Sequence, residues 1–237
     1  MSAASRAVGS GAPPTAAPSE RVRLRRRRDR GSYDRAVIDA ILDEALIAHL
    51  GIVDPHGQPL VIPTLHARCG EVVYVHGSAA SRTLRTLAAG ARACLTVSLI
   101  DGLVLARSAM HHSANYRSVV LLGRAWSVEE PAHKRAAFEA IVEHIVPGRW
   151  PDVRPPSANE LKATAVLAMG IDEASAKVRT GPPVDDEEDY ASETWAGVIP
   201  LRTQAGAPLA DARLPRGVRP PDYARAYRRA ARTTPAA

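Results

Sequence analysis

Three side chains that follow a strand-like run have the chemistry to bind a phosphate group. Residues 72–87, VVYVHGSAASRTLRTL, alternate at period two up to His76, break at a Gly-Ser pair and continue at helical spacing. The hydroxyls of Ser78 and Ser81, the N–H groups of the first helical turn and the Arg82 guanidinium would meet a phosphate together. An ordinary helix with Ser81 as N-cap and a solvated Arg82 explains the same pattern equally well.

Length and composition indicate a folded protein without a membrane span. The chain of 237 residues is long enough for one domain with extensions, or for two small domains. Two cysteines, Cys69 and Cys94, are too few for a disulfide scaffold, and no apolar run approaches the roughly 18 to 20 residues of a membrane span. No secretory signal pattern opens the chain. We therefore expect a soluble, cytoplasmic protein.

The net charge of +6 belongs to the two ends of the chain. Residues 1–30 and 201–237 each carry a charge of +6, which leaves −6 on the part between them. The arginine run Arg25 to Arg28 has the charge to contact nucleic-acid phosphates, but it lacks interleaved aromatic residues for base stacking. A solvated arm is the simpler interpretation, and we favour it over nucleic-acid contact.

Composition and hydrophobic periodicity divide the chain into three parts. We expect a disordered Arg-rich arm at 1–31, a folded domain at 32–201 and a basic extension at 202–237. Helices are predicted at 34–44, 81–89 and 132–146, and strands at 49–53, 60–68, 72–76, 91–99, 103–105, 117–128, 163–171 and 175–179. Asp101-Gly102 predicts a hairpin turn.

This succession predicts a mainly β fold, an antiparallel β-barrel with peripheral helices. Most of the predicted strands are joined to their neighbours by short turns, and helices are few. The sequence contains neither GxGxxG nor GxxxxGK[ST], so a Rossmann pocket and a P-loop have no support.

Five sequence blocks together resemble a known family. They are VIPTLHAR at 61–68, VYVHGSAASRTL at 73–84, HHSANYRSVVLLGRA at 111–125, ASAKVRTGPP at 174–183 and WAGVIPL at 195–201. In this order they are similar to the flavin-nucleotide-binding branch of the pyridoxamine phosphate oxidase-like family, which includes nitroimidazole reductases. The resemblance implies a split β-barrel homodimer that binds FMN in two clefts at the subunit interface.

The resemblance also implies which residues form each cleft. Backbone groups would reach the flavin ring from Val61, Ile62, Pro63 and Thr64. The phosphate would be held by Ser78, Ser81 and Arg82. The partner subunit would close the site with Asn115, Tyr116, Arg117 and Ser118, and Arg117 would add positive charge. Lys177 and Arg179 would face the same cleft, and Trp195 would cap it or anchor the tail.

Two histidines of these blocks differ in what the resemblance implies. His76 matches a histidine beside the flavin, where an imidazole near its solution pKa could donate a proton to a reduced substrate. A strand histidine bonded to a backbone carbonyl is the structural alternative. His66 stands where family members often carry an aromatic ring such as tyrosine, so ring stacking or substrate shape would differ here.

Two further polar clusters are weaker candidates for a functional site. His111 and His112 are adjacent on an expected strand, point to opposite faces and have no third ligand at zinc-like spacing, so we expect no metal site. The acidic run 185–189 is interpreted as a solvated loop, with pairing to an arginine tail as the alternative.

The function that the sequence favours is an FMN-dependent oxidoreductase for an unidentified small molecule, with NAD(P)H as electron donor. A split barrel that uses haem or a deazaflavin is the nearest alternative. From a different class, a non-catalytic flavin carrier or redox sensor with basic tails on nucleic acid fits the same residues.

Overall fold

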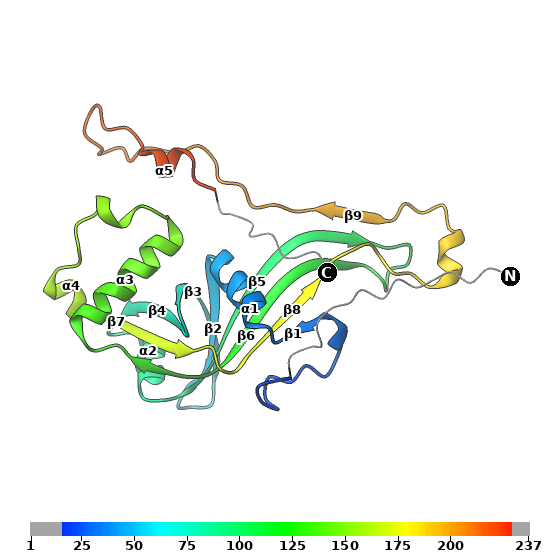
Figure 1. The fold of residues 1–237 in the computed structure, drawn as a ribbon, viewed down its shortest axis with the longest axis horizontal. Coiled ribbons are helices and arrows are strands. Elements are labelled where there is room, and N and C mark those ends of the chain that lie inside the picture. The colour runs from blue at the N-terminus through cyan, green and yellow to red at the C-terminus, as the bar shows by residue number, and fades with distance from the viewer. Residues whose placement is uncertain (1–15, 229–237) are drawn as a thin grey trace.

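Nine antiparallel strands of the described residues form one sheet that closes on itself (Figure 1). The computed structural model describes residues 16–228. The strands are β1 (Gly31–Ser32), β2 (Ile47–Val53), β3 (Pro59–Cys69), β4 (Val72–Ser78), β5 (Arg92–Leu105), β6 (Ser113–Ser127), β7 (Thr164–Gly170), β8 (Ala174–Arg179) and β9 (Gly197–Pro200). The helices are α1 (Arg35–Glu44), α2 (Arg82–Ala88), α3 (Pro131–Ile145), α4 (Ala158–Ala163) and α5 (Asp222–Arg225), with 3-10 turns η1 (Arg28–Arg30), η2 (Trp150–Asp152) and η3 (Glu187–Ala191). The predicted mainly β barrel with peripheral helices is confirmed.

Strand β6 closes the barrel. The strand order is β1-β8-β6-β7-β4-β3-β2-β5-β9, and β6 also pairs with β5. Strands β2 to β7 therefore form a closed ring, while β8 and β1 extend it beside one half of β6 and β9 adds to the end of β5. Local turn chemistry supports this order. In the β2–β3 turn, the Asp54 carboxylate accepts the N–H groups of His56 and Gln58, and Gly57 takes a positive φ of 83°.

The predicted hairpin at Asp101-Gly102 is wrong, because β5 runs through both residues as one strand. Its register against β6 shifts between Ile100 and Gly102, so the pair forms a bulge and not a turn. A Cβ on Gly102 would lie 3.0 Å from a side-chain carbon of Val198 on β9. The glycine therefore permits the close approach of β9, which a local turn signal could not reveal.

The apolar side chains form two clusters on opposite faces of the sheet. The larger one fills the barrel and includes Leu42 of α1, Leu121 of β6 and Leu167 of β7, none of which is exposed. The smaller one lies between α3 and the outer face of β3, β4 and β7, with Tyr74 and Ile141 at its centre. Burial of each large side chain contributes about 1.5–3 kcal/mol, so the barrel cluster provides the main stabilisation. No helix within residues 16–228 is both long and apolar enough to cross a lipid bilayer.

The segment before β1 is packed onto the barrel, whereas its composition predicted disorder up to residue 31. Val22 is only 4% exposed, and the guanidinium of Arg21 pairs with the Glu173 carboxylate at 2.6 Å. The N–H of Leu24 donates to the hydroxyl of Tyr33 at 2.7 Å. These partners lie far along the chain or inside the core, so the composition of the arm alone could not indicate them. The first half of the expected arm, residues 1–15, lies outside the described residues.

The basic extension leaves the barrel along β9 and returns to α3 (Figure 1). Residues 201–220 are exposed. The extension then reaches the end of α3, where the hydroxyl of Tyr223 donates to Asp152 and that of Tyr227 donates to the Ile145 carbonyl at 2.8 Å. Its last nine residues, 229–237, lie outside the described part of the chain.

Candidate functional site

The loop between β4 and α2 brings the three predicted phosphate ligands together. The side-chain oxygen of Ser81 accepts the N–H of Leu84 at 3.4 Å, and that of Ser78 accepts the N–H of Ala80 at 3.2 Å. Ser81 is therefore the N-cap of α2, as the capped-helix interpretation requires. Each hydroxyl still has its own hydrogen to donate, and Arg82 is exposed at the start of the helix. The cap and the phosphate cradle are thus compatible with each other.

Strands β3 and β4 part beside this loop. They pair only from His66 to Cys69 of β3, whereas residues 59–65 of β3 pair with β2 alone. On their other edge, residues 61–64 meet no strand within the described part of the chain, so alternate N–H and C=O groups along that edge have no ladder partner. Residues 61–64, which the family resemblance assigned to the flavin ring, therefore carry available backbone donors and acceptors.

His76 lies on the side of β4 that packs against α3. Its ring meets the ring of Phe138 edge-on, with centroids 5.6 Å apart, and Nδ1 is buried without a hydrogen-bond partner among the described residues. Burial lowers the pKa of His76 below its ordinary value of 6.5. The imidazole is therefore neutral at pH 7, which weakens the case for an imidazolium proton donor. Its alternation with Ser78 places both on one side of β4.

His66 does not contribute a ring to this side of the barrel. It is completely buried, its Nε2 lies 3.0 Å from the Leu42 carbonyl of α1, and its ring lies 5.0 Å from that of His144. The expected effect on ring stacking or substrate shape therefore has no support, since this side chain packs between the sheet and two helices.

The second half of the predicted site lies at the other end of β6. Ser118 pairs with Lys177 and Tyr116 pairs with Arg179 across β6 and β8. By contrast, α2 lies near Arg124, whose guanidinium donates to the Gly90 carbonyl. Arg124 lies nine positions along the strand from Asn115, or about 30 Å at 3.3 Å per residue. The C-terminal end of α2 and residues 115–118 therefore lie beside different ends of β6.

Arg117, predicted to add positive charge to the cofactor site, forms ion pairs within the chain. Its guanidinium pairs with the carboxylates of Glu44 and Asp101, at 2.7 Å for Asp101. Hydrogen bonds to Asp101 and then to Glu44 raise the pKa of Arg117, despite the opposing effect of burial. Its charge is therefore already neutralised, by residues far from it in sequence.

The other cationic residues of the prediction have different environments. Arg179 is buried and donates to the side-chain oxygen of Asn115 at 2.5 Å, while the Asn115 amide donates to the Gly181 carbonyl at 3.1 Å. Lys177 donates to the Arg26 carbonyl at 3.2 Å. Trp195 is 65% exposed just before β9, and its role as a cap or a tail anchor stays a prediction.

The acidic run is not simply solvated, since Asp185 is buried against Arg107. The Arg107 guanidinium donates to its carboxylate at 2.9 Å and the Arg107 N–H donates to it at 3.0 Å. Burial raises the pKa of Asp185, but these bonds from Arg107 outweigh burial and lower it overall. Sequence analysis missed this pair, and a lone acidic loop after Gly-Pro-Pro gave no signal for its partner.

The acidic run also brings two carboxylates near His111. Ligand atoms of His111, Asp186 and Asp189 all lie within 4.8 Å of one another. The Ser108 hydroxyl lies 2.8 Å from Nδ1 of His111 and fixes the ring. The sequence offered no third ligand at zinc-like spacing, and these carboxylates come from a loop more than seventy residues away. All three side chains are at least partly exposed, as is common without a metal ion.

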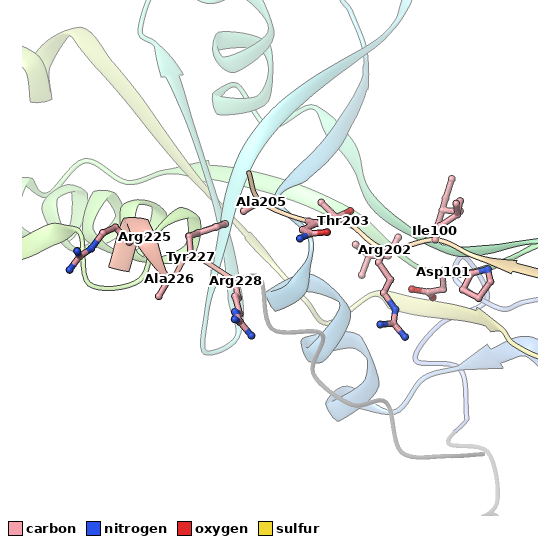
Figure 2. A pocket seen from close by; sticks show the side chains of 13 residues that line it. Ile100, Asp101, Arg202, Thr203, Ala205, Arg225, Ala226, Tyr227 and Arg228 are labelled. Atoms are coloured by element: carbon pink, nitrogen blue, oxygen red, sulfur yellow. The ribbon is translucent and has the colours of Figure 1, made fainter. Parts of the chain in front are cut away.

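A groove lies between the basic extension and the middle of β5 (Figure 2). Its volume is about 970 Å³, and it is lined by Leu99, Ile100 and Asp101 of β5 together with residues 200–205 and 225–228. Arg202, Arg225 and Arg228 line it, yet it contains none of the residues that sequence analysis assigned to the cofactor. The sequence predicted a basic extension, and in the structure these three arginines line the groove beside β5.

Comparison with known proteins identifies the fold and family. The family model described as pyridoxamine 5'-phosphate oxidase matches residues 34–178. Among solved structures, the flavocytochrome Anf3 from Azotobacter vinelandii is 46% identical with a TM-score of 0.83, covering 89% of this chain and 97% of its own. The FAD and haem binding protein from Mycobacterium smegmatis is 38% identical with a TM-score of 0.78, covering 82% and 95%.

A more distant structure shares the fold alone. It is described as a 5-nitroimidazole antibiotic resistance protein from Bacteroides thetaiotaomicron, is 24% identical with a TM-score of 0.53, and the match covers 62% of this chain and 86% of that one. A search of curated proteins gave no match. The matched core, the ring closed by β6 and the two highly similar flavin- or haem-binding structures together show that the chain belongs to the pyridoxamine 5'-phosphate oxidase family of split β-barrels.

Proposed function

We propose that the protein is a flavin-dependent redox protein whose flavin lies between the free edge of β3 and the β4–α2 loop. The observation that carries the proposal is the parting of β3 and β4. It leaves the backbone groups of residues 61–64 available beside a loop that presents Ser78, Ser81 and Arg82. Backbone donors and acceptors suit the polar edge of a flavin ring, and hydroxyls with a guanidinium suit its phosphate.

The flavin, when bound, supplies the electron-transfer chemistry. Residues 61–64 orient its ring, and Ser78, Ser81 and Arg82 neutralise and hold its phosphate. Burial lowers the pKa of His76, so its imidazole is neutral at pH 7. A neutral imidazole suits packing beside the flavin ring better than proton donation. Replacement of His76 by Gln with unchanged turnover and flavin content would remove the side chain from the mechanism.

For the flavin itself we propose FAD in place of FMN. The Mycobacterium smegmatis structure, 38% identical to this chain, is that of an FAD and haem binding protein. The β4–α2 loop accepts a phosphate from either nucleotide. Purified protein that is yellow supports the flavin proposal, and chromatography of the flavin released on denaturation separates FAD from FMN. A colourless protein that takes up neither flavin contradicts the proposal.

As a second function we propose haem binding, because both highly similar structures are described as haem or flavocytochrome proteins. The donor chemistry fits, since haem iron commonly takes imidazole and His76 has a buried ring nitrogen without a partner among the described residues. A Soret band in the purified protein, lost in His76→Gln while flavin remains, supports this assignment. A Soret band that His76→Gln leaves unchanged excludes His76 as the ligand.

We propose further that two copies of the chain assemble and complete each site. Residues 115–118 lie at one end of β6, and the C-terminal end of α2 contacts Arg124, about 30 Å further along the strand, so a second copy would supply residues 115–118 to the site beside α2. The outer sheet face also exposes large apolar side chains: Ile47 (43%), Val53 (56%), Val61 (67%) and Ile100 (59%). Such a contiguous apolar face commonly marks an interface. Light scattering should give a dimer, and Ile100→Asp should weaken it.

NAD(P)H is the proposed electron donor, for reduction of an unidentified small molecule. Bleaching of the flavin absorption by NADH or NADPH under anaerobic conditions, followed by recovery with an electron acceptor, supports an enzyme. A flavin that neither nucleotide reduces favours the carrier or sensor alternative, including one with nucleic-acid contacts through its tails.

A further inference from the structure

Arg179 is a buried cation whose hydrogen-bond partners are all neutral. Its side chain is 7% exposed at the end of β8 and donates to the Asn115 side-chain oxygen and, at 3.2 Å, to the Pro182 carbonyl. Within residues 16–228, no carboxylate lies close enough to form an ion pair with it. A buried charge normally has a counter-charge, because desolvation without one is costly. The described residues do not provide that counter-charge.

The nearest charges around Arg179 increase the imbalance. Burial lowers the pKa of Arg179, and the positive charges of Arg30 and Arg27 lower it further. These arginines reach β8 because β1 pairs with β8, with Gly31 opposite Lys177. The Lys177 ammonium also donates to the Arg26 carbonyl and ties the arginine run to the strand. Positive charge therefore gathers at one edge of the sheet.

The backbone of the arginine run holds two of these side chains in a defined arrangement. Arg27 has a φ of 53° and a ψ of 56°, and it is the one non-glycine residue with positive φ within the described part of the chain. Its carbonyl accepts the N–H of Arg30 at 3.2 Å and closes a 3-10 turn. Residues three apart in such a turn lie on the same side. A strained backbone conformation of this kind often occurs at ligand sites.

We propose that Arg27, Arg30 and Arg179 form a binding site for an oxyanion of the bound cofactor, a phosphate or a carboxylate. Guanidinium groups bind both anions through paired hydrogen bonds. Asn115 acts as a positioning residue, because its amide bridges Arg179 and the Gly181 carbonyl. The site gives the arginine run a role in cofactor binding, in place of the solvated arm that its composition predicted.

The identity of the anion rests on the proposed function. In one chain the site lies at the far end of β6 from the β4–α2 loop, so it takes an anionic group other than the phosphate held by that loop in the same chain. Two groups have the required chemistry: the diphosphate of a flavin dinucleotide and the propionate carboxylates of haem. The experiments below distinguish them.

The test compares two double variants with equal loss of charge. Arg27→Gly with Arg30→Gln removes both site charges, and glycine tolerates the positive φ at position 27. Arg25→Gln with Arg28→Gln is the matched control, since neither residue is among the charges that act on Arg179. Arg179 itself stays unchanged because it is buried. A third variant, Arg30→Lys with Arg27 unchanged, keeps the positive charge but loses the planar guanidinium. It therefore tests the contribution of charge separately from that of guanidinium geometry.

Inorganic pyrophosphate is the first probe, because it is independent of the proposed function. Thermal unfolding of the full chain should shift upward with pyrophosphate in the wild type and the control. In the site variant the apparent Kd should rise by about tenfold or more, and the difference should shrink at high salt. If wild type and site variant respond alike to pyrophosphate and to every cofactor, the proposal is overturned.

Titrations with FAD, FMN and haemin then identify the source of the anion. A diphosphate site predicts weaker FAD binding in the site variant with FMN and haemin unchanged. A propionate site predicts weaker haemin binding with both flavins unchanged. If the wild type binds none of the three but pyrophosphate still separates the variants, the proposed function fails while the oxyanion site stands.

Discussion

Arg117 on β6 holds the carboxylate of Glu44, the last residue of α1, through two hydrogen bonds from its two terminal nitrogens. The same guanidinium holds Asp101 at the bulge of β5, at 2.7 and 2.9 Å. Three elements therefore meet at one cation, and each contributing side chain is largely shielded from water. Within the chain, Arg117 therefore acts as a structural crosslink between α1, β5 and β6.

Arg117→Met should therefore destabilise the protein strongly. It leaves two carboxylates near each other without a cation, a change that typically costs about 3–5 kcal/mol. For a domain of this size, the loss corresponds to a fall in Tm of roughly 6–20 °C. Calorimetry or circular dichroism measures it. Arg92→Met, at an exposed arginine on β5, is the control and should change stability by no more than about 0.5 kcal/mol. Equal effects of the two substitutions would refute the crosslink.

Ser81→Asp and Ser81→Ala should separate the cap from the cradle. Aspartate is an equally good N-cap, so Ser81→Asp should keep the Tm, whereas Ser81→Ala should lose about 1 kcal/mol. The aspartate charge would repel a phosphate, so Ser81→Asp should lose flavin while it remains folded. Flavin content and thermal unfolding of each variant provide the measurement. Full flavin retention by Ser81→Asp would leave Ser81 as a cap alone.

His76 should make the stability of the protein dependent on pH below 6.5. Because burial lowers the pKa of His76 in the folded state, the unfolded chain binds a proton more readily than the folded chain. The contribution of the neutral ring is complete above about pH 6.5 and is lost as the pH falls toward the lower folded value. His76→Gln should therefore lose less stability than the wild type between pH 7.5 and pH 5.

Thermal unfolding at both pH values measures this difference, and His56→Gln, at an exposed histidine of the β2–β3 turn, is the matched control. A wild-type pH dependence that His76→Gln retains in full would show that another group carries it.

Glu160 should contribute to stability in acid. Hydrogen bonds from Arg154, and then from the Ser157 N–H, lower the pKa of Glu160 to about 2. Since the folded value lies below the ordinary 4.5, this contribution is present above about pH 4.5 and disappears as the pH falls toward 2. Glu160→Gln should flatten the acid unfolding curve over that interval, and more so at low salt because the pair is exposed. An acid transition with the same midpoint and slope in both proteins would contradict it.

Local sequence signals predicted most elements but failed where distant strands decide the outcome. The helix after Ser81 and the turn at Asp54 were predictable, because cap and turn residues act within four positions. Asp101-Gly102 has the same local chemistry as a turn, yet pairing with β6 and β9 keeps the chain extended through it. The short α4, with its capping box from Ser157 to Glu160, was missed although the signal was present in the sequence.

The candidate site shows the same division. Composition predicted a solvated arm for the arginine run; Arg25 to Arg28 are exposed, but pairing of Gly31 with Lys177 fixes the run at the edge of the sheet. The acidic loop was predicted without partners, but Asp185 meets Arg107 from another part of the chain. In both cases the partner is remote in sequence, so no local pattern contains it.

The sequence by itself determined the alternation of the strands, the cap of α2 and the five blocks that indicate the family. These depend on side-chain periodicity and on hydrogen bonds between near neighbours, which are written in consecutive residues. Only the tertiary structure decided that β3 and β4 part beside residues 61–64, that Arg117 is neutralised and that the turn with Arg27 and Arg30 leads into β1 beside β8, the strand that ends at Arg179. The physical reason is that strand register and charge compensation arise between segments far apart in the chain, and closure of the barrel by β6 brings those segments together.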